Sequence, residues 1–170
     1  MSRKRNTREI RTTLLVVAEG KAEENFLSYL KRSLTRERRG PQVTIRNANG
    51  KGAAHVIDRA VRLSGNYDLK AVLVDSDTDW DDRQATIARK AGIEVVLSEP
   101  CFEALLLGIV GVSAAGKNTK DCKRTFRSTF GCEAQDPTLY GSQILLADII
   151  DSRESFAYLD ALLKLFEFEK

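Results

Sequence analysis

The chain has 170 residues, of which 42% are hydrophobic and 30% are charged, and its formal net charge is +3. This balance is typical of a globular protein and excludes a disordered chain, and the length suits one domain whose core needs no disulfide or structural metal. No apolar run approaches the roughly 20 residues of a membrane span, and no signal sequence follows the basic residues 1–11. We therefore expect a cytoplasmic protein that has no membrane partner.

Strand and helix patterns alternate through the first part of the chain. Residues 12–18, 69–74 and 93–97 are apolar runs, which are typical of strands in a parallel sheet covered on both faces. Residues 42–47 predict a weaker strand at the edge of the sheet. Apolar residues at helical spacing follow each strand. The alternation predicts an α/β fold, with right-handed crossovers and helices on both faces of a four-stranded parallel sheet.

The strand signals end near Gly111. A polar stretch with several lysines follows over residues 113–127, and apolar residues at helical spacing return near 139–150 and 156–166. We expect these two helices to pack on the same core as the sheet. The predicted organisation is one domain over residues 1–170, made of a basic segment (1–11), an α/β core (12–112) and a helical C-terminal part (113–170).

Four carboxylates follow two of the buried strands. Glu19 comes directly after the first apolar run and Glu23 lies four residues further on, whereas Asp75 follows the run that ends at residue 74 and Asp77 lies two residues after it. The carboxyl ends of parallel strands share one edge of the sheet, where open α/β sheets bind ligands at the point of strand-order reversal. If the reversal falls between Glu19 and Asp75, the strand order is 2-1-3-4.

Carboxylates this close repel one another unless a cation neutralises them. The chain has one histidine, and its three cysteines are far apart in sequence, so oxygen donors remain, which favour Mg²⁺ or Mn²⁺ over zinc. We therefore predict a magnesium or manganese site formed by these four carboxylates. The alternative is that acidic residues near helix starts are only caps and dipole partners, which would suffice for Asp79, Asp81 and Asp82.

Three segments, VVAEGKAEENF, VDSD and SEPCFEALLL, resemble the three blocks of RloB-like proteins, a Toprim family associated with prokaryotic restriction and defence loci. The resemblance spans residues 14–109 and implies a Toprim-like (Rossmann-like) fold. It also implies that Glu19 is the Toprim glutamate, which binds metal or transfers protons, and that Asp75 and Asp77 are the metal-binding aspartates.

The same resemblance matches two further acids. Glu23 corresponds to the second acid of Toprim nucleases of the two-metal kind, and Glu103 corresponds to the acid of the third block. Glu99 and Glu103 are thus possible auxiliary acids. The sequence departs from the family pattern at four positions, where Ser76 replaces an arginine, Glu99 replaces an asparagine, and Ala104 and Gly108 replace bulkier residues.

Basic residues form two groups that could follow a phosphate backbone, although ordinary solvated helix faces look similar. The members that we single out are Arg32, Arg36 and Arg39 after the first strand, and Lys117, Lys120, Lys123 and Arg124 in the polar stretch. A fixed cation near the metal site would stabilise charge in the transition state of phosphodiester cleavage, and Lys120 is our preferred candidate.

The function that we expect is Mg²⁺- or Mn²⁺-dependent cleavage of nucleic acid in antiphage defence, with Glu19, Asp75, Asp77 and Lys120 as catalytic residues. RNA or tRNA is favoured slightly over DNA, because so small a chain lacks an apparatus to encircle a duplex. An RNA-processing Toprim ribonuclease is an alternative with the same chemistry. A non-catalytic alternative is a defence sensor or effector that binds nucleic acid or nucleotide, or docks on a partner protein.

Overall fold

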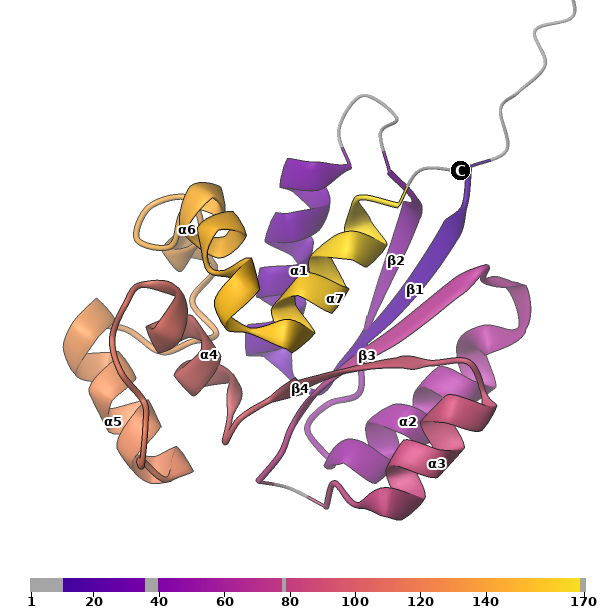
Figure 1. Cartoon of the computed structure of the whole chain (residues 1–170), viewed down its shortest axis with the longest axis horizontal. Coiled ribbons are helices and arrows are strands. Elements are labelled where there is room, and N and C mark those ends of the chain that lie inside the picture. The colour runs from indigo at the N-terminus through magenta and orange to yellow at the C-terminus, as the bar shows by residue number, and fades with distance from the viewer. Residues whose placement is uncertain (1–10, 36–39, 78, 169–170) are drawn as a thin grey trace, which may run out of the picture.

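A computed structural model describes residues 11–35, 40–77 and 79–168. Four parallel strands form one sheet in the order β2-β1-β3-β4, which confirms the predicted α/β class and strand order (Figure 1). The strands are β1 (Thr13–Ala18), β2 (Gln42–Asn47), β3 (Leu69–Asp75) and β4 (Glu94–Ser98).

Helices cover both faces of the sheet, as predicted. Figure 1 shows α1 (Lys21–Leu34) and α7 (Ala157–Phe166) on one face, and α2 (Ala53–Leu63) and α3 (Asp82–Lys90) on the other. Successive side chains of a strand point to opposite faces, and the apolar run of β1 therefore supplies both cores. Leu14 and Val16 belong to the core beneath α1 and α7, whereas Leu15 belongs to the core beneath α2 and α3.

The chain beyond β4 is helical and shares the larger core. It contains α4 (Phe102–Ile109), α5 (Thr119–Phe130) and α6 (Leu146–Asp151) in addition to α7. The buried residues Ile149 and Leu162 confirm that the two C-terminal apolar patterns pack on the same core as the sheet. The polar stretch was not predicted to contain a helix, yet most of α5 lies within it. None of the described helices is long and apolar enough to cross a membrane.

Backbone hydrogen bonds fix the segments at the carboxyl ends of β1, β3 and β4. The Glu19 N–H donates to the Leu73 carbonyl (3.2 Å), which extends the pairing of β1 with β3. After β3, the Ser76 N–H donates to the Ser98 carbonyl (2.9 Å) and the Asp77 N–H donates to the Pro100 carbonyl (3.2 Å). The acidic segment after β3 is therefore held against the start of α4.

Candidate functional site

The first two predicted acids lie at the carboxyl edge of the sheet with Asp75. The Asp75 backbone N–H donates to Glu19 Oε2 (3.2 Å), so the ends of β1 and β3 are bridged by a predicted site residue. The Glu23 carboxylate turns back toward the same edge, because its Oε2 accepts a hydrogen bond from the Gly20 N–H (3.0 Å). This is the geometry of a glutamate in the first turn of a capped helix. The structure thus brings together the two pairs that the sequence placed on separate strands.

A second set of residues approaches this edge from the helices that follow β4. The Thr119 hydroxyl, in the first turn of α5, donates a short hydrogen bond to Asp77 Oδ2. Glu103 lies in the first turn of α4, and its charge acts on both Glu23 and Asp75. The carboxylate cluster, by which we mean Glu19, Glu23, Asp75, Asp77 and Glu103, is therefore built from three separate segments of the chain.

The surroundings of the cluster oppose ionisation. Burial, together with the charges of Glu19 and Glu103, raises the pKa of Glu23 to about 7. Burial, together with repulsion from Glu23, Glu19, Glu103 and Asp77, raises the pKa of Asp75 to about 8. The pKa of Glu19 is raised chiefly by burial, although the hydrogen bond from Asp75 lowers it. A cation in this place would relieve the repulsion.

The predicted ligands have the donor atoms that a hard divalent cation prefers, but they are not grouped around one ion position. All are carboxylate oxygens, which Mg²⁺ and Mn²⁺ prefer. Among the described residues, however, no three acidic, histidine or cysteine side chains are grouped so that they could hold one ion. Glu19 and Glu23 instead accept backbone hydrogen bonds, and Asp77 accepts one from Thr119. The metal-ligand assignments therefore stay predictions.

One face of α5 brings a positive charge to the cluster. The charge of Lys123 lowers the pKa of Glu19 against the larger effect of burial. Lys123 follows Thr119 by four residues and shares its helix face. Lys120 follows Thr119 by one residue, so it points about 100° away from Thr119 around the helix axis. Lys120 and Lys123 are both exposed, and the catalytic role of Lys120 stays a prediction. The contact between Thr119 and Asp77 thus favours Lys123 as the cation nearest the carboxylates.

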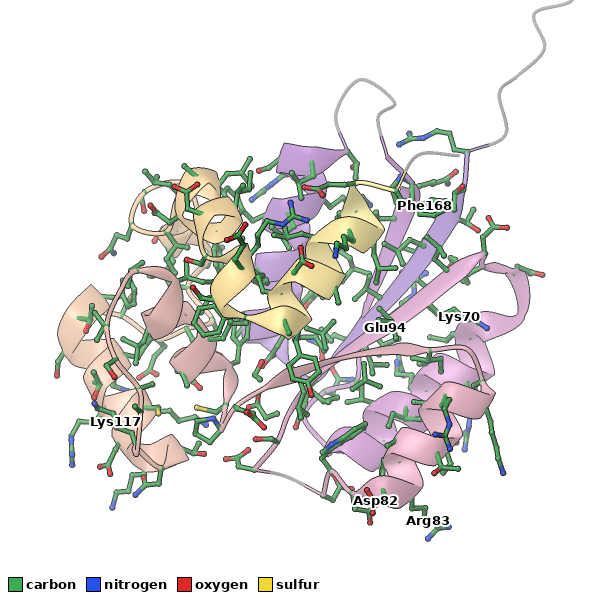
Figure 2. All side chains as sticks on the ribbon, viewed as in Figure 1. Lys70, Asp82, Arg83, Glu94, Lys117 and Phe168 are labelled. Carbon is green, nitrogen blue, oxygen red and sulfur yellow. The ribbon has the colours of Figure 1, made fainter. Side chains whose placement is uncertain are left out.

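Two other predicted phosphate-binding residues of this region have local partners. Lys117 Nζ donates to the Ser113 carbonyl (2.9 Å), and Arg124 forms an ion pair with Asp121 (2.8 Å). Figure 2 shows Lys117 beside α5. The phosphate contacts of Lys117 and Arg124 therefore stay predictions.

Arg32, the described member of the basic group after the first strand, is not near the carboxylates. Helix α1 begins at Lys21, next to the carboxyl edge of the sheet, and Arg32 is exposed in its last turn. The rise of an α-helix places Arg32 about 16 Å further along the axis, toward the amino edge of the sheet. Arg36 and Arg39 lie outside the described residues. The structure therefore separates Arg32 from the predicted catalytic residues.

Two of the neighbouring aspartates are helix caps, as the alternative interpretation held. The Asp79 carboxylate accepts hydrogen bonds from the Ala54 N–H (3.3 and 3.4 Å) at the start of α2. Asp81 accepts from the N–H groups of Arg83 (2.7 Å) and Gln84 (3.1 Å) at the start of α3. Each satisfies backbone donors that a helix start leaves unpaired.

Sequence reasoning missed three side chains around the cluster. Thr119 holds Asp77. Tyr140 is buried where Glu23 and Glu103 add to the effect of burial in raising its pKa, and Cys101 is buried beside Glu103, with burial and the charge of Glu103 both raising the pKa of its thiol. Only the polar start of α5 offered a local signal, since Asn118 is a common N-cap residue and does accept from the Asp121 N–H (2.9 Å). Tyr140 approaches the cluster from a distant part of the sequence, and Cys101 lies only two residues before Glu103.

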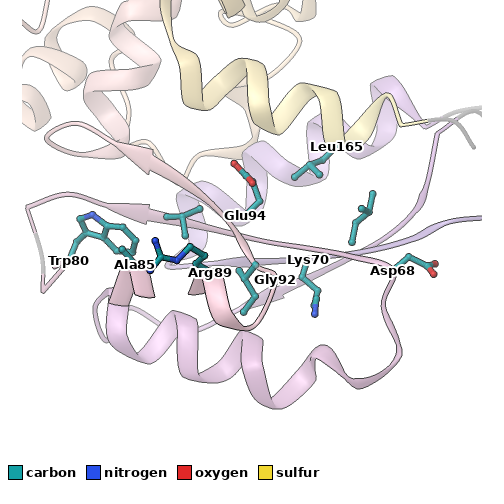
Figure 3. A pocket seen from close by; sticks show the side chains of 11 residues that line it. Asp68, Lys70, Trp80, Ala85, Arg89, Gly92, Glu94 and Leu165 are labelled. Atoms are coloured by element: carbon teal, nitrogen blue, oxygen red, sulfur yellow. The ribbon is translucent and has the colours of Figure 1, made fainter. Parts of the chain in front are cut away.

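Cavities lie on either side of β4. One of about 590 Å³ adjoins the carboxylate cluster and is lined in part by Ser76, the residue between its two aspartates. Another, of about 500 Å³, is lined by Trp80, Arg89 and Glu94 and contains none of the predicted site residues (Figure 3). The cavity that can serve the cluster is therefore the first one.

Comparison with known proteins supports the resemblance seen in the sequence. A family model described as RloB-like protein matches residues 14–144, which include all but the first residue of β1, the whole of β2 to β4 and all five residues of the carboxylate cluster. No curated protein and no solved structure was found to match the chain. Since the family match covers well over half of its length, the chain belongs to the RloB-like family.

Proposed function

We propose that this protein is a Toprim-type endonuclease that depends on Mg²⁺ or Mn²⁺ and cleaves RNA in preference to DNA in prokaryotic defence. The observation that carries the proposal is the carboxylate cluster, in which burial and mutual repulsion raise the pKa of Glu19, Glu23 and Asp75. Strongly perturbed acids of this kind gather at functional sites because they are costly to the fold.

The residues take distinct roles in this proposal. Glu19, Glu23, Asp75 and Asp77 would hold the metal, which when bound would activate water and neutralise charge on the phosphodiester. Glu19 is the candidate general base, because a raised pKa makes its carboxylate a better proton acceptor near neutral pH. Lys123 stabilises negative charge on the phosphate, and Lys120 remains the alternative for this role.

The substrate class follows from size and charge. Lys117, Lys120, Lys123 and Arg124 would offer phosphate contacts near the start of α5. Proteins read RNA mostly in single strands and loops, which a chain too small to encircle a duplex could still bind. Processing of cellular RNA would use the same chemistry. We place the protein in the cytoplasm, where it would meet RNA and any partner protein of a defence system.

A second candidate function is non-catalytic binding of nucleic acid or nucleotide. It is favoured by one observation, namely that no three donors among the described residues are grouped around a single ion position. The presence of Ser76 where the family pattern has an arginine points the same way, since a phosphate contact is lost.

The two candidates are separated by one experiment. The purified chain is incubated with labelled total RNA and with plasmid DNA in the presence of Mg²⁺, Mn²⁺ or EDTA. The proposal expects RNA fragments in Mg²⁺ or Mn²⁺ and none in EDTA. Asp77→Asn should produce no fragments, whereas Asp81→Asn, the matched change at a helix cap, should cleave RNA as the wild type does. If the protein binds RNA but cleaves it under none of the metal conditions, the second candidate is supported.

A further inference from the structure

The cavity beside the carboxylate cluster has the position of a substrate subsite. Its volume of about 590 Å³ lies within the usual range for small-molecule pockets, roughly 300–1,000 Å³. Ser76, on its wall, lies between Asp75 and Asp77, so the cavity and the cluster share the segment after β3. Lys117, which also lines the cavity, lies two residues before Thr119, whose hydroxyl donates to Asp77, so the cavity lies beside the Asp77 side of the cluster.

One wall of the cavity is an aromatic ring kept in place by a glycine. Phe156, just before α7, lines the cavity and is partly exposed. A Cβ atom added to Gly108 would lie 2.4 Å from the ring, so only glycine at this position of α4 lets the ring lie here. Ala104, one turn earlier on α4, also lines the cavity and keeps it open. Aromatic rings of this kind stack on unpaired bases.

The polar part of the lining is small and specific. Glu99 is exposed just after β4, and the other polar side chains of the lining are Lys117, Ser76 and Ser113. The Ser76 hydroxyl donates to the Pro100 carbonyl (3.4 Å), which leaves its oxygen as an acceptor. The four departures from the family pattern, at Ser76, Glu99, Ala104 and Gly108, all line this one cavity.

We propose that this cavity binds a single unstacked guanine base of the substrate strand, next to the phosphate held at the carboxylate cluster. The inference rests on the proposed function and adds the base that the site selects. An ionised carboxylate only accepts hydrogen bonds, and guanine alone among the four bases presents two adjacent donors, N1–H and the 2-amino group, on its Watson–Crick edge. Glu99 accepts both, Phe156 stacks on the ring, and Lys117 contacts a flanking phosphate.

The test measures binding by the full chain in EDTA, where cleavage cannot interfere, and in Ca²⁺, which carboxylate oxygens bind and which would neutralise the cluster for the phosphate. The probe is a short, labelled single-stranded oligouridine with one central guanosine, compared by fluorescence anisotropy with probes that carry adenosine, cytidine or inosine there. A paired contact to one carboxylate should favour guanosine roughly tenfold, by analogy with other bidentate base contacts. Inosine lacks the 2-amino group and should fall between guanosine and adenosine. Equal affinity for all four probes would overturn the proposal.

Variants assign the preference to the cavity. Glu99→Gln keeps only one acceptor and should reduce the guanosine preference to about twofold or less. Glu94→Gln, on the same strand but outside this cavity, should leave the preference unchanged. Phe156→Ala should weaken binding of every probe roughly tenfold, and Phe156→Tyr should restore it. An unaltered preference in Glu99→Gln would contradict the assignment.

Failure of this inference is distinct from failure of the proposed function. Metal-dependent cleavage that shows no preference for guanosine supports the nuclease and rejects the base pocket. Guanosine-selective binding without cleavage in Mg²⁺ or Mn²⁺ supports the pocket and rejects the nuclease.

Discussion

The two edges of the sheet use carboxylates in opposite ways. At the amino edge, Asp68 accepts hydrogen bonds from the backbone N–H and the hydroxyl of Thr13, both at 2.8 Å, and Arg11 donates to the carbonyls of Gly40 (2.9 Å) and Pro41 (3.1 Å). At the carboxyl edge, burial and neighbouring charges raise the pKa of Glu23 and Asp75. The first arrangement stabilises the fold and the second costs stability, so the second points to function.

Removal of one acid at each edge tests this contrast most strongly. Asp77→Asn or Asp75→Asn should lower metal-dependent RNA cleavage roughly 10³-fold or more, because each removes a predicted ligand, and Glu19→Gln should be at least as damaging. Asp68→Asn should leave cleavage unchanged and cost about 1 kcal/mol of stability. Single-turnover assays and urea unfolding measure the two effects. Wild-type Mn²⁺ affinity by calorimetry in either aspartate variant of the cluster would contradict the ligand assignment.

The basic residues provide the next comparison. Lys123→Ala should slow single-turnover cleavage roughly 10²-fold with little change in RNA binding, because its charge is used mainly in the transition state. Arg32→Ala, near the amino edge, should leave the rate at saturating RNA unchanged. Lys120→Ala separates the two candidates on α5. If it proves to be the slow variant and Lys123→Ala does not, the choice based on the helix face of Thr119 is wrong.

The pH dependence of stability should carry the signature of the carboxyl edge. Because the folded pKa values of Glu23 and Asp75 are raised to about 7 and about 8 from 4.5 and 3.8, the folded state binds protons more tightly than the unfolded state. The unfolding free energy of the metal-free protein should therefore fall as the pH rises from about 4 to about 8, by at least about 2 kcal/mol after allowance for partial exposure. Urea unfolding in EDTA at several pH values measures this slope.

Two additions sharpen the pH experiment. Glu23→Gln and Asp75→Asn should each flatten the slope, because each removes a group that titrates in this range. Mn²⁺ should raise the unfolding free energy more at pH 8 than at pH 5, where protons compete for the carboxylates. A slope that is unchanged in both variants would show that other groups cause it.

The smallest effect is expected at the buried thiols beside the cluster. Cys101 and Cys122 are buried, and burial raises the pKa of both. With no histidine to activate them, they are poor nucleophiles, so Cys101→Ser should change the cleavage rate by no more than about threefold. Inactivation of the wild type by one equivalent of a thiol reagent, absent in Cys101→Ser, would refute this.

The parts of the fold that could be predicted are those that leave a local pattern. The apolar runs of β1 and β3 signal buried strands by themselves, and the acids that follow them must share an edge once the strands are parallel. Helix α5 was missed because its buried residues, Cys122, Phe126 and Phe130, are diluted by lysines, arginines and threonines. Their spacing of four residues was nevertheless a helical signal.

The rest of the site depends on contacts between distant segments. The hydrogen bond from Thr119 to Asp77 spans 42 positions, and no spacing rule predicts it. Without it, the helix face that meets the carboxylates is unknown, and Lys120 and Lys123 are equivalent candidates. The same holds for the cavity, because Phe156 and Gly108 meet only after α7 has packed.

The position of α7 has a consequence for the order in which the protein is completed during synthesis. All four strands and the carboxylate cluster are encoded before residue 104, yet the face of the sheet beneath α1 is closed by Leu159, Leu162, Leu163 and Phe166 of α7. At typical translation rates, residue 166 follows residue 103 by about 3 to 13 s. The acidic residues are therefore synthesised while one face of the sheet still lacks α7. If the protein is a nuclease, it would become active only after the ribosome has translated α7.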